Sequence, residues 1–426
     1  MINAFFLILQ GNYPEQTMPS TKTAPVLVTP LSKTTASYRL ASIDILRAIT
    51  MVLMIFVNDL WSLKGIPAWL EHVSYEADGM GLADTIFPAF LFIVGMSIPF
   101  AIQSRRKKGE TTGQIIRHIL IRSAALLIMG LFLVNGEYID EEVTSIHKMV
   151  WYSLCCFSFI LIWNSYPKSA NKRFVQVARL LGAGLLIVLA FIYRSEQNGQ
   201  ITYFSTHWWG ILGLIGWAYL ASALIVTFSN NNLYGLLLAW GIFCVLSIVH
   251  SANYTPSWLT IIPSPISGGT LAGFTMGGVV ITRLFQLYRK QASPQKMLIL
   301  FLILAGLLTV AGFYTRTFWG ISKLRATPAW LFLCSAITIV AFVGIYWLTD
   351  LRKKAHWFSF IKPAGNNTLL CYLIPYFAYL FMSVPGMNLP EVFLTGEFGL
   401  TKSFLFALLC VAITGGLSVV GVRLKL

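Results

Sequence analysis

Long apolar stretches with few charges recur along the whole chain. Many of them reach about 18 residues, which is enough to cross about 30 Å of hydrocarbon as an α-helix. Within lipid, only helices and closed barrels satisfy every backbone polar group. The residues are 56% hydrophobic and only 11% charged, far from the composition of a water-soluble globular protein. The sequence therefore predicts an all-α, polytopic integral membrane protein.

We expect about twelve transmembrane helices, because that many apolar windows have a suitable length. The expected spans cover residues 42–62, 86–103, 115–135, 148–164, 174–193, 207–228, 233–250, 268–288, 296–314, 327–348, 365–383 and 402–422. Within the span at 268–288, the run GGTLAGFTMGG places small residues at helical spacing, which favours close packing of a neighbouring helix.

The charge distribution predicts the orientation. Loops rich in Lys and Arg stay cytoplasmic, and with the N-terminus inside they fall at 105–108, 168–173, 289–296 and 352–362. Most acidic residues fall in the opposite loops, so both termini are predicted to be cytoplasmic. The net charge of +15 is then mainly an inner-surface charge that suits an anionic lipid bilayer, and it requires no nucleic-acid partner.

Residues 1–37 combine a short apolar stretch, INAFFLIL, with a run rich in Pro, Thr and Ser. Because they lack a basic n-region and a small-residue cleavage site, we interpret them as a disordered cytoplasmic tail. Residues 38–426 then form one transmembrane domain. All six cysteines fall within predicted helices without CxxC spacing, so they are interpreted as buried apolar residues and no metal site is predicted.

The first span contains three polar residues, Asp44, Arg47 and Asn58. At 100° per residue they share one helix face, and the rise from Arg47 to Asn58 is about 16 Å. Charged groups in a membrane face a partner or a water-filled cavity. One interpretation is therefore a site reached from both sides. In the other, Asp44 and Arg47 pair at (i, i+3) near the interface, while Asn58 caps the helix end.

A histidine, His72, lies in the loop that follows the first span. Imidazole suits general base catalysis near neutral pH. However, His147, His207 and His250 also lie in or beside loops predicted on the same side, and a lone loop histidine is usually only solvated. The HWWG run at 207–210 allows two interpretations as well, an interfacial aromatic belt or a floor on which a sugar stacks.

The segments YRLASIDILRAITMVLMIFVN (38–58) and LADTIFPAFLFIVGMSI (82–98) resemble the core of the heparan-alpha-glucosaminide N-acetyltransferase family and its bacterial relatives. That family has an Arg-Leu-x-Ser-Leu-Asp-x-x-Arg-Gly run, a helix ending in Val-Asn, a loop histidine and then Ala-Asp-x-x-Phe-Pro. The matching residues include Arg39, Ser42, Asp44, Arg47, Asn58, His72, Asp84, Phe87 and Pro88. The spacing from Arg47 to Asn58 is also similar to an Arg-to-His interval in the wider superfamily of membrane acyltransferases.

The resemblance thins further along the chain. HWWGILGLIGWAYL, WGISKLRATPAWLF and KPAGNNTLLCY look like later family segments and add Lys323 and Asn366 as candidate site residues. Ala48 stands where the family usually has Gly, and the family's Gly-Val-Leu-Gln-Arg segment is absent where NGEYIDEEVTSIHKMVW stands. These departures put the identity of the substrate in question.

What the resemblance implies is a transmembrane acetyl relay in a bacterial cytoplasmic membrane, with residues 38–426 as the acyltransferase domain. Acetyl-CoA would be the cytosolic co-substrate, and the amine of a terminal glucosamine on the far side would be the acceptor. His72 would take the amine proton, and the amide of Asn58 would bind the thioester oxygen. The implied donor- or acceptor-binding residues are Arg47, Asp44, Asp84, Lys323 and Asn366.

Two other classes stay open at this point. About twelve spans with both ends inside also fit a secondary transporter of a small polar solute. However, the two halves show no convincing similarity, and the polar motifs concentrate in the first two spans. The third class is a membrane scaffold without chemistry. N- versus O-acetylation and the oligomeric state, with a homodimer as one alternative, are also open.

Overall fold

The computed structural model describes residues 40–197, 199–291, 293–383 and 389–426. The predicted tail, residues 1–37, lies outside these ranges. The α-helices are α2 (Ala41–Asp59), α3 (Leu82–Lys107), α4 (Thr112–Tyr138), α5 (Glu141–Thr144), α6 (Lys148–Trp163), α7 (Lys172–Ile192), α8 (Ile211–Phe228), α9 (Leu233–Ser251), α10 (Ser264–Ser267), α11 (Thr270–Gln291), α12 (Pro294–Trp319), α13 (Pro328–Tyr346), α14 (Lys362–Asn366), α15 (Thr368–Ser383) and α16 (Gly396–Val419).

Short elements occupy several of the connections. They are the 3-10 helices η1 (Leu60–Ser62), η2 (Ala68–Leu70), η3 (Ser257–Ile261), η5 (Ala355–Phe358) and η6 (Glu391–Leu394), the π-helix η4 (Trp347–Leu351), and the strands β1 (Ser195–Gln197) and β2 (Gln200–Thr202). The two strands pair antiparallel, with Ser195 opposite Thr202.

Each predicted span overlaps a helix, and within the described ranges ten helices are long and apolar enough to cross a membrane. The prediction of an all-α polytopic membrane protein is therefore confirmed. Helices α6 and α15 are apolar but have only 16 residues each. The predicted span at 365–383 is interrupted, because α14 ends at Asn366 and α15 begins at Thr368. The number twelve and the cytoplasmic termini stay predictions.

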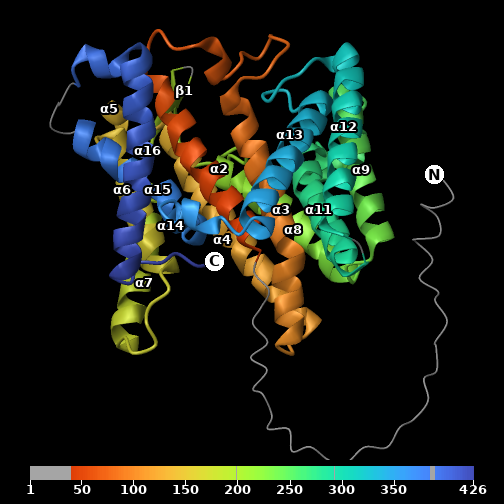
Figure 1. Cartoon of the computed structure of the whole chain (residues 1–426). Helices are drawn as coiled ribbons and strands as arrows, with labels where there is room; N and C mark the ends of the chain where they lie inside the picture. The colour runs from red at the N-terminus through yellow and green to blue at the C-terminus, as the bar shows by residue number, and fades with distance from the viewer. Residues whose placement is uncertain (1–39, 198, 292, 384–388) are drawn as a thin grey trace, which may run out of the picture. The chain divides into compact units, whose positions relative to one another are not determined.

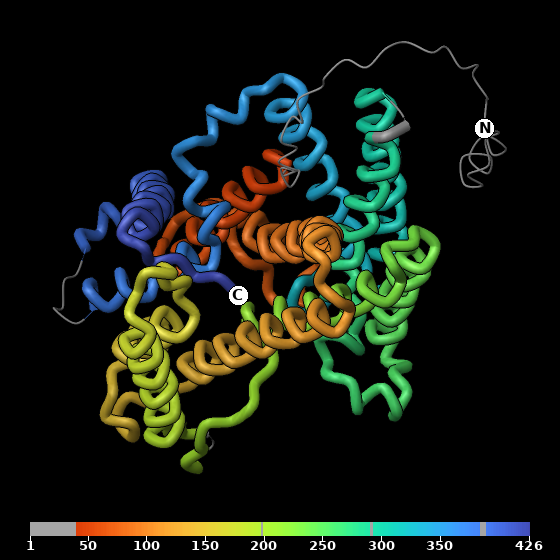
Figure 2. The backbone as a smooth tube through the Cα atoms, turned by 90° about the horizontal axis from the view of Figure 1, so that it is seen from below, coloured from red at the N-terminus to blue at the C-terminus, as the bar shows by residue number. Residues whose placement is uncertain are grey.

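Figure 1 shows how the helices of residues 40–426 are grouped. Helices α2, α3, α4 and α8 lie between two other sets. One set contains α6, α7, α15 and α16, and the other contains α9, α11, α12 and α13. The turned view in Figure 2 shows the same order, with the orange α3 between the yellow and green segments. Helix α2 contacts α3, α13, α14, α15 and α16, so its polar face is surrounded by other helices.

Helix α3 is held against α11 by close backbone contact. A Cβ atom added at Gly278 of α11 would lie 1.9 Å from the backbone oxygen of Phe92, and one at Gly95 of α3 would lie 1.8 Å from that of Thr275. Only glycine permits this approach, as the small-residue run at 268–278 predicted. The contact fixes α3, whose first turn carries Asp84.

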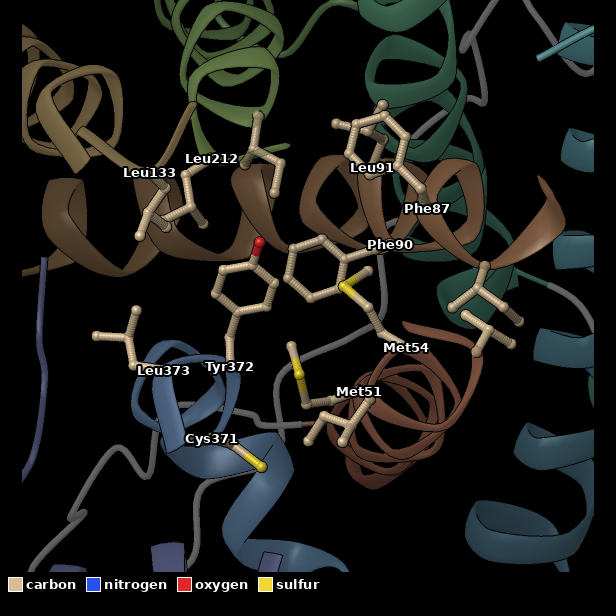
Figure 3. Packing of buried hydrophobic residues seen from close by; sticks show 14 of the residues in the cluster. Met51, Met54, Phe87, Phe90, Leu91, Leu133, Leu212, Cys371, Tyr372 and Leu373 are labelled. Atoms are coloured by element: carbon tan, nitrogen blue, oxygen red, sulfur yellow. The ribbon is translucent and has the colours of Figure 1, made fainter. Parts of the chain in front are cut away.

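A buried cluster fills the space between α2, α3, α4, α8 and α15. Figure 3 shows Met51 and Met54 of α2 beside the rings of Phe90 and Tyr372, with Leu133 of α4 nearby. Methionine adapts to the irregular gaps that aromatic rings leave. Met54 and Tyr372 also line cavities beside this cluster, so the cluster forms part of the cavity walls.

Candidate active site

The loop between α2 and α3 folds back onto the first turn of α3. The side chain of Asp84 is only 2% exposed, and its Oδ1 lies 2.6 Å from Nδ1 of His72. Its Oδ2 accepts hydrogen bonds from the backbone N–H groups of Val73 (3.0 Å) and Gly81 (3.1 Å). A Cβ at Gly81 would lie 1.9 Å from the backbone oxygen of Glu71, so the tight loop requires glycine there. One buried carboxylate thus fixes both ends of residues 72–81, here called the His72 loop.

The hydrogen bond to Asp84 also assigns the tautomer of His72. A carboxylate oxygen accepts, so the ring proton is placed on Nδ1, and Nε2 retains a lone pair. The His72 side chain is half exposed, whereas Asp84 is buried. His72 is therefore not a lone, solvated loop histidine. It is an oriented imidazole that can accept a proton at Nε2.

Lys323 reaches the same cluster from the connection between α12 and α13. Its Nζ lies 3.2 Å from Nδ1 of His72 and 3.8 Å from Oδ1 of Asp84. Because Nδ1 carries the proton donated to Asp84, we attribute the approach of the ammonium to the negative charge of the carboxylate. Burial lowers the pKa of Lys323, and the charge of Asp84 acts in the opposite direction. The cluster thus joins two segments that are far apart in the sequence.

A second acid, Asp78, fastens the His72 loop to that connection. Its Oδ1 accepts from the backbone N–H of Ile321 at 2.7 Å, and its Oδ2 accepts from Nε of Arg316 at 2.9 Å. The backbone hydrogen bond from Ile321 lowers the pKa of Asp78, and Arg316 adds to this effect. Ile321 lies two residues before Lys323, so Asp78 links the segment that carries His72 to the segment that carries Lys323.

His72 and Lys323 line a cavity of about 460 Å³, here called the His72 cavity. Asn58 lines it too, and so do Trp208 and Trp209 of the HWWG run. Asn58 is exposed, and no side-chain hydrogen bond to another described residue is found for it. The C-cap of α2 is Leu60, so the structure does not support the helix-cap interpretation of Asn58. Its amide can donate to a molecule in the cavity.

A second cavity, of about 280 Å³ and here called the Arg47 cavity, is lined by Arg47, Ser97, Arg122 and Asn366. The Nη1 atom of Arg47 donates to Oδ1 of Asp44 at 3.1 Å, and Nη2 donates to Oγ of Ser97 at 2.6 Å. The (i, i+3) pair is thus present, as one interpretation of the first span predicted. The same arginine also faces a cavity, as the other interpretation predicted.

The predicted site residues therefore fall into two groups. Asn58, His72, Asp84 and Lys323 gather at the end of α2, and Asp44, Arg47 and Asn366 gather near its start. Met54 and Ile211 line both cavities, so the two cavities share a wall.

The sequence interpretation missed several contributors. Ser97 and Trp330 lie within the family-like segments, but the sequence interpretation did not single them out. The indole N–H of Trp330 donates to the backbone oxygen of Asp84 at 2.9 Å. Arg122 could have been found, because an arginine within an apolar span indicates a functional site.

The fold and these cavities define a class: an all-α, multi-pass membrane protein with an oriented histidine at one end of a polar helix face and an arginine at the other. Residues 39–154 match the family described as heparan-alpha-glucosaminide N-acetyltransferase, catalytic. This chain is thus similar to that family over its first transmembrane region, where the sequence resemblance lies. The matched range includes Asn58, His72 and Asp84 but not Lys323 or Asn366.

Two curated relatives carry the name heparan-alpha-glucosaminide N-acetyltransferase. The protein from Homo sapiens is 36% identical over 101 residues, which are 24% of this chain and 14% of that protein. The protein from Mus musculus is 33% identical over 110 residues, which are 26% of this chain and 16% of that protein. The chain thus spans only a small part of the length of each of these relatives.

Proposed function

We propose that this protein is a transmembrane N-acetyltransferase that moves an acetyl group from cytosolic acetyl-CoA to an amino sugar on the far side of the membrane. The observation that carries the proposal is the His72–Asp84 pair, in which His72 lines the same cavity as Asn58. The names of the two curated relatives support the reaction class and the acceptor.

The donor binds in the Arg47 cavity. CoA carries phosphates, which arginine recognises by charge-assisted hydrogen bonds. Arg47 and Arg122 both line this cavity, and the basic loops predicted to be cytoplasmic add positive potential around its entrance. The acyl arm extends along the polar face of α2 toward Asn58. Met54 and Ile211 lie on this route, because they line both cavities.

The transfer takes place in the His72 cavity. The amine nitrogen of the acceptor attacks the thioester carbonyl carbon, and Nε2 of His72 takes the proton that the nitrogen loses. The amide of Asn58 donates a hydrogen bond to the carbonyl oxygen as negative charge develops on it. The C–S bond then breaks, and the departing sulfur takes the proton from the imidazolium. Asp84 keeps the proton on Nδ1 and stabilises the imidazolium.

An acetyl group carried covalently by His72 would use the same residue. A quenched reaction with acetyl-CoA alone separates the two routes, because only the covalent route leaves an acetylated peptide that contains His72.

The decisive experiment measures radiolabelled acetyl transfer from acetyl-CoA to glucosamine by the purified protein in liposomes. Labelled N-acetylglucosamine should form with the wild-type protein and not with His72→Ala. Uptake of unmodified glucosamine without acetylation would instead establish the transporter alternative. Absence of both activities in folded protein would overturn the proposal.

A further inference from the structure

Asn58 also lines a third cavity, of about 500 Å³, between α2, α4, α15 and the start of α8. We name it the Glu137 cavity. Its polar and aromatic lining consists of Asn58, Trp61, Glu137, Tyr372, Tyr376 and Tyr379. Neither the matched sequence motifs nor the proposed reaction uses this cavity, apart from the shared Asn58.

Glu137, near the end of α4, supplies the charge of this cavity. The residue is exposed, and among the described residues no cation lies within ion-pair distance of its carboxylate. Lys148 is nearby, but its Nζ donates to the backbone oxygen of Glu137 at 2.9 Å instead of to the carboxylate. A carboxylate that faces a cavity without a bonded cation is suited to bind a cationic ligand.

Aromatic side chains line the rest of the cavity. The rings of Tyr372 and Tyr376 have centroids 6.1 Å apart, and the indole of Trp61 is 75% exposed. The hydroxyl of Tyr379 is already used, because it donates to Asp59 at 2.9 Å, so this residue offers its ring. Aromatic faces attract ammonium groups and provide flat surfaces for the apolar faces of sugar rings. The lining thus matches a ligand that has both a positive charge and a ring.

We propose that the Glu137 cavity is a docking subsite for the ammonium form of an amino sugar, in which Glu137 is the counter-ion and determines specificity. The role of this binding in acetyl transfer rests on the proposed function. Because Asn58 lines both cavities, a sugar in this subsite lies beside the group that we assign to the thioester oxygen. The ammonium then loses one proton to water before the nitrogen attacks, and His72 takes the second proton during the attack.

Equilibrium binding to the purified protein without acetyl-CoA tests the subsite directly. Glucosamine should bind more tightly than glucose, which lacks the charge, and more tightly than ethanolamine, which lacks the ring. Glu137→Gln should weaken glucosamine binding by about 10-fold to 100-fold, the scale of a charge-assisted contact, and should leave glucose binding unchanged. The matched control is Glu142→Gln, since Glu142 is an exposed acid on the neighbouring α5.

Two results would overturn the subsite: wild-type affinity for glucosamine in Glu137→Gln, or equal affinity of the wild-type protein for glucosamine, glucose and ethanolamine. The acetyl-transfer assay separates this failure from that of the proposed function. Acetylation with an unchanged KM in Glu137→Gln would refute the subsite alone. Binding that depends on Glu137, in a protein that transfers no acetyl group, would refute the acetyltransferase proposal alone.

Discussion

Replacing Asp84 by Asn tests the assignment of His72 most directly. The change keeps the size of the side chain but gives it one oxygen and one NH₂ group. In the wild-type protein the backbone N–H groups of Val73 and Gly81 donate to Oδ2. In the variant we expect them to donate to the amide oxygen. The NH₂ group then faces Nδ1 of His72, which must become the acceptor. The ring proton moves to Nε2, and the lone pair needed for the amine proton is lost.

The magnitude of this effect is set by the loss of the base. An Asp-to-Asn change that leaves the geometry intact but reverses the histidine tautomer lowers kcat by about 10,000-fold in a serine protease. At about 1.4 kcal/mol for each factor of ten, this is about 5.5 kcal/mol of transition-state stabilisation. Hydrogen bonds to the carboxylate contribute about 1.5 to 3 kcal/mol each, against about 1 kcal/mol for neutral ones. The two backbone bonds therefore weaken by about 1 to 4 kcal/mol together.

The assay measures kcat and KM for acetyl transfer together with acetyl-CoA binding. Asp84→Asn should lose turnover and keep acetyl-CoA affinity, because the Arg47 cavity lies at the other end of α2. The thermal unfolding midpoint measures the weaker backbone hydrogen bonds to residue 84 separately from the loss of turnover. Retention of a tenth or more of the wild-type kcat would show that the tautomer of His72 does not matter, and would refute its role as the base.

Three further changes test other parts of the site. His72→Ala should lower kcat by about 100-fold to 10,000-fold, with acetyl-CoA binding retained, whereas the exposed His147 should tolerate the same change. Asn58→Ala should lower turnover by about 100-fold to 1,000-fold with little effect on acetyl-CoA affinity, and wild-type turnover would exclude an oxyanion role. Asp78 has a lowered folded-state pKa, so its contribution to stability is present above its unfolded pKa of about 3.9 and is lost as pH falls through the folded value. Asp78→Asn should therefore lower the unfolding midpoint at pH 7, with a smaller difference below about pH 4; an equal difference at both pH values would contradict this.

The helical part of the site could be predicted because a helix is a local structure. The 3.6-residue period placed Arg47 and Asn58 on one face, and both do line cavities that share a wall. The position of Lys323, in contrast, could not be predicted from a local pattern. It reaches His72 across 251 residues, and only the packing of α12 and α13 brings it there. A short motif suggested the residue, but no periodicity could have placed it.

The Glu137 cavity could not be predicted, for a related reason. Its lining comes from α2, α4, α8 and α15, and each contributes only one or a few side chains. In the sequence, Glu137 cannot be distinguished from any other acidic residue near the end of a helix. Asp59 is similar, because no local pattern in the sequence indicates that Lys402 is its partner. The structure pairs them at 2.6 Å across 343 residues.

Asp59 fixes the end of α2, next to Asn58. Its side chain is 4% exposed, and its carboxylate accepts hydrogen bonds from Lys402, Ser403 and Tyr379. Burying a charge costs several kcal/mol unless such partners compensate for it. Asp59 thereby ties the end of α2 to α15 and α16 one residue after Asn58, just as Asp84 ties the His72 loop to α3. The imidazole of His72 is therefore held directly by a buried carboxylate, and the backbone that carries Asn58 is held by another.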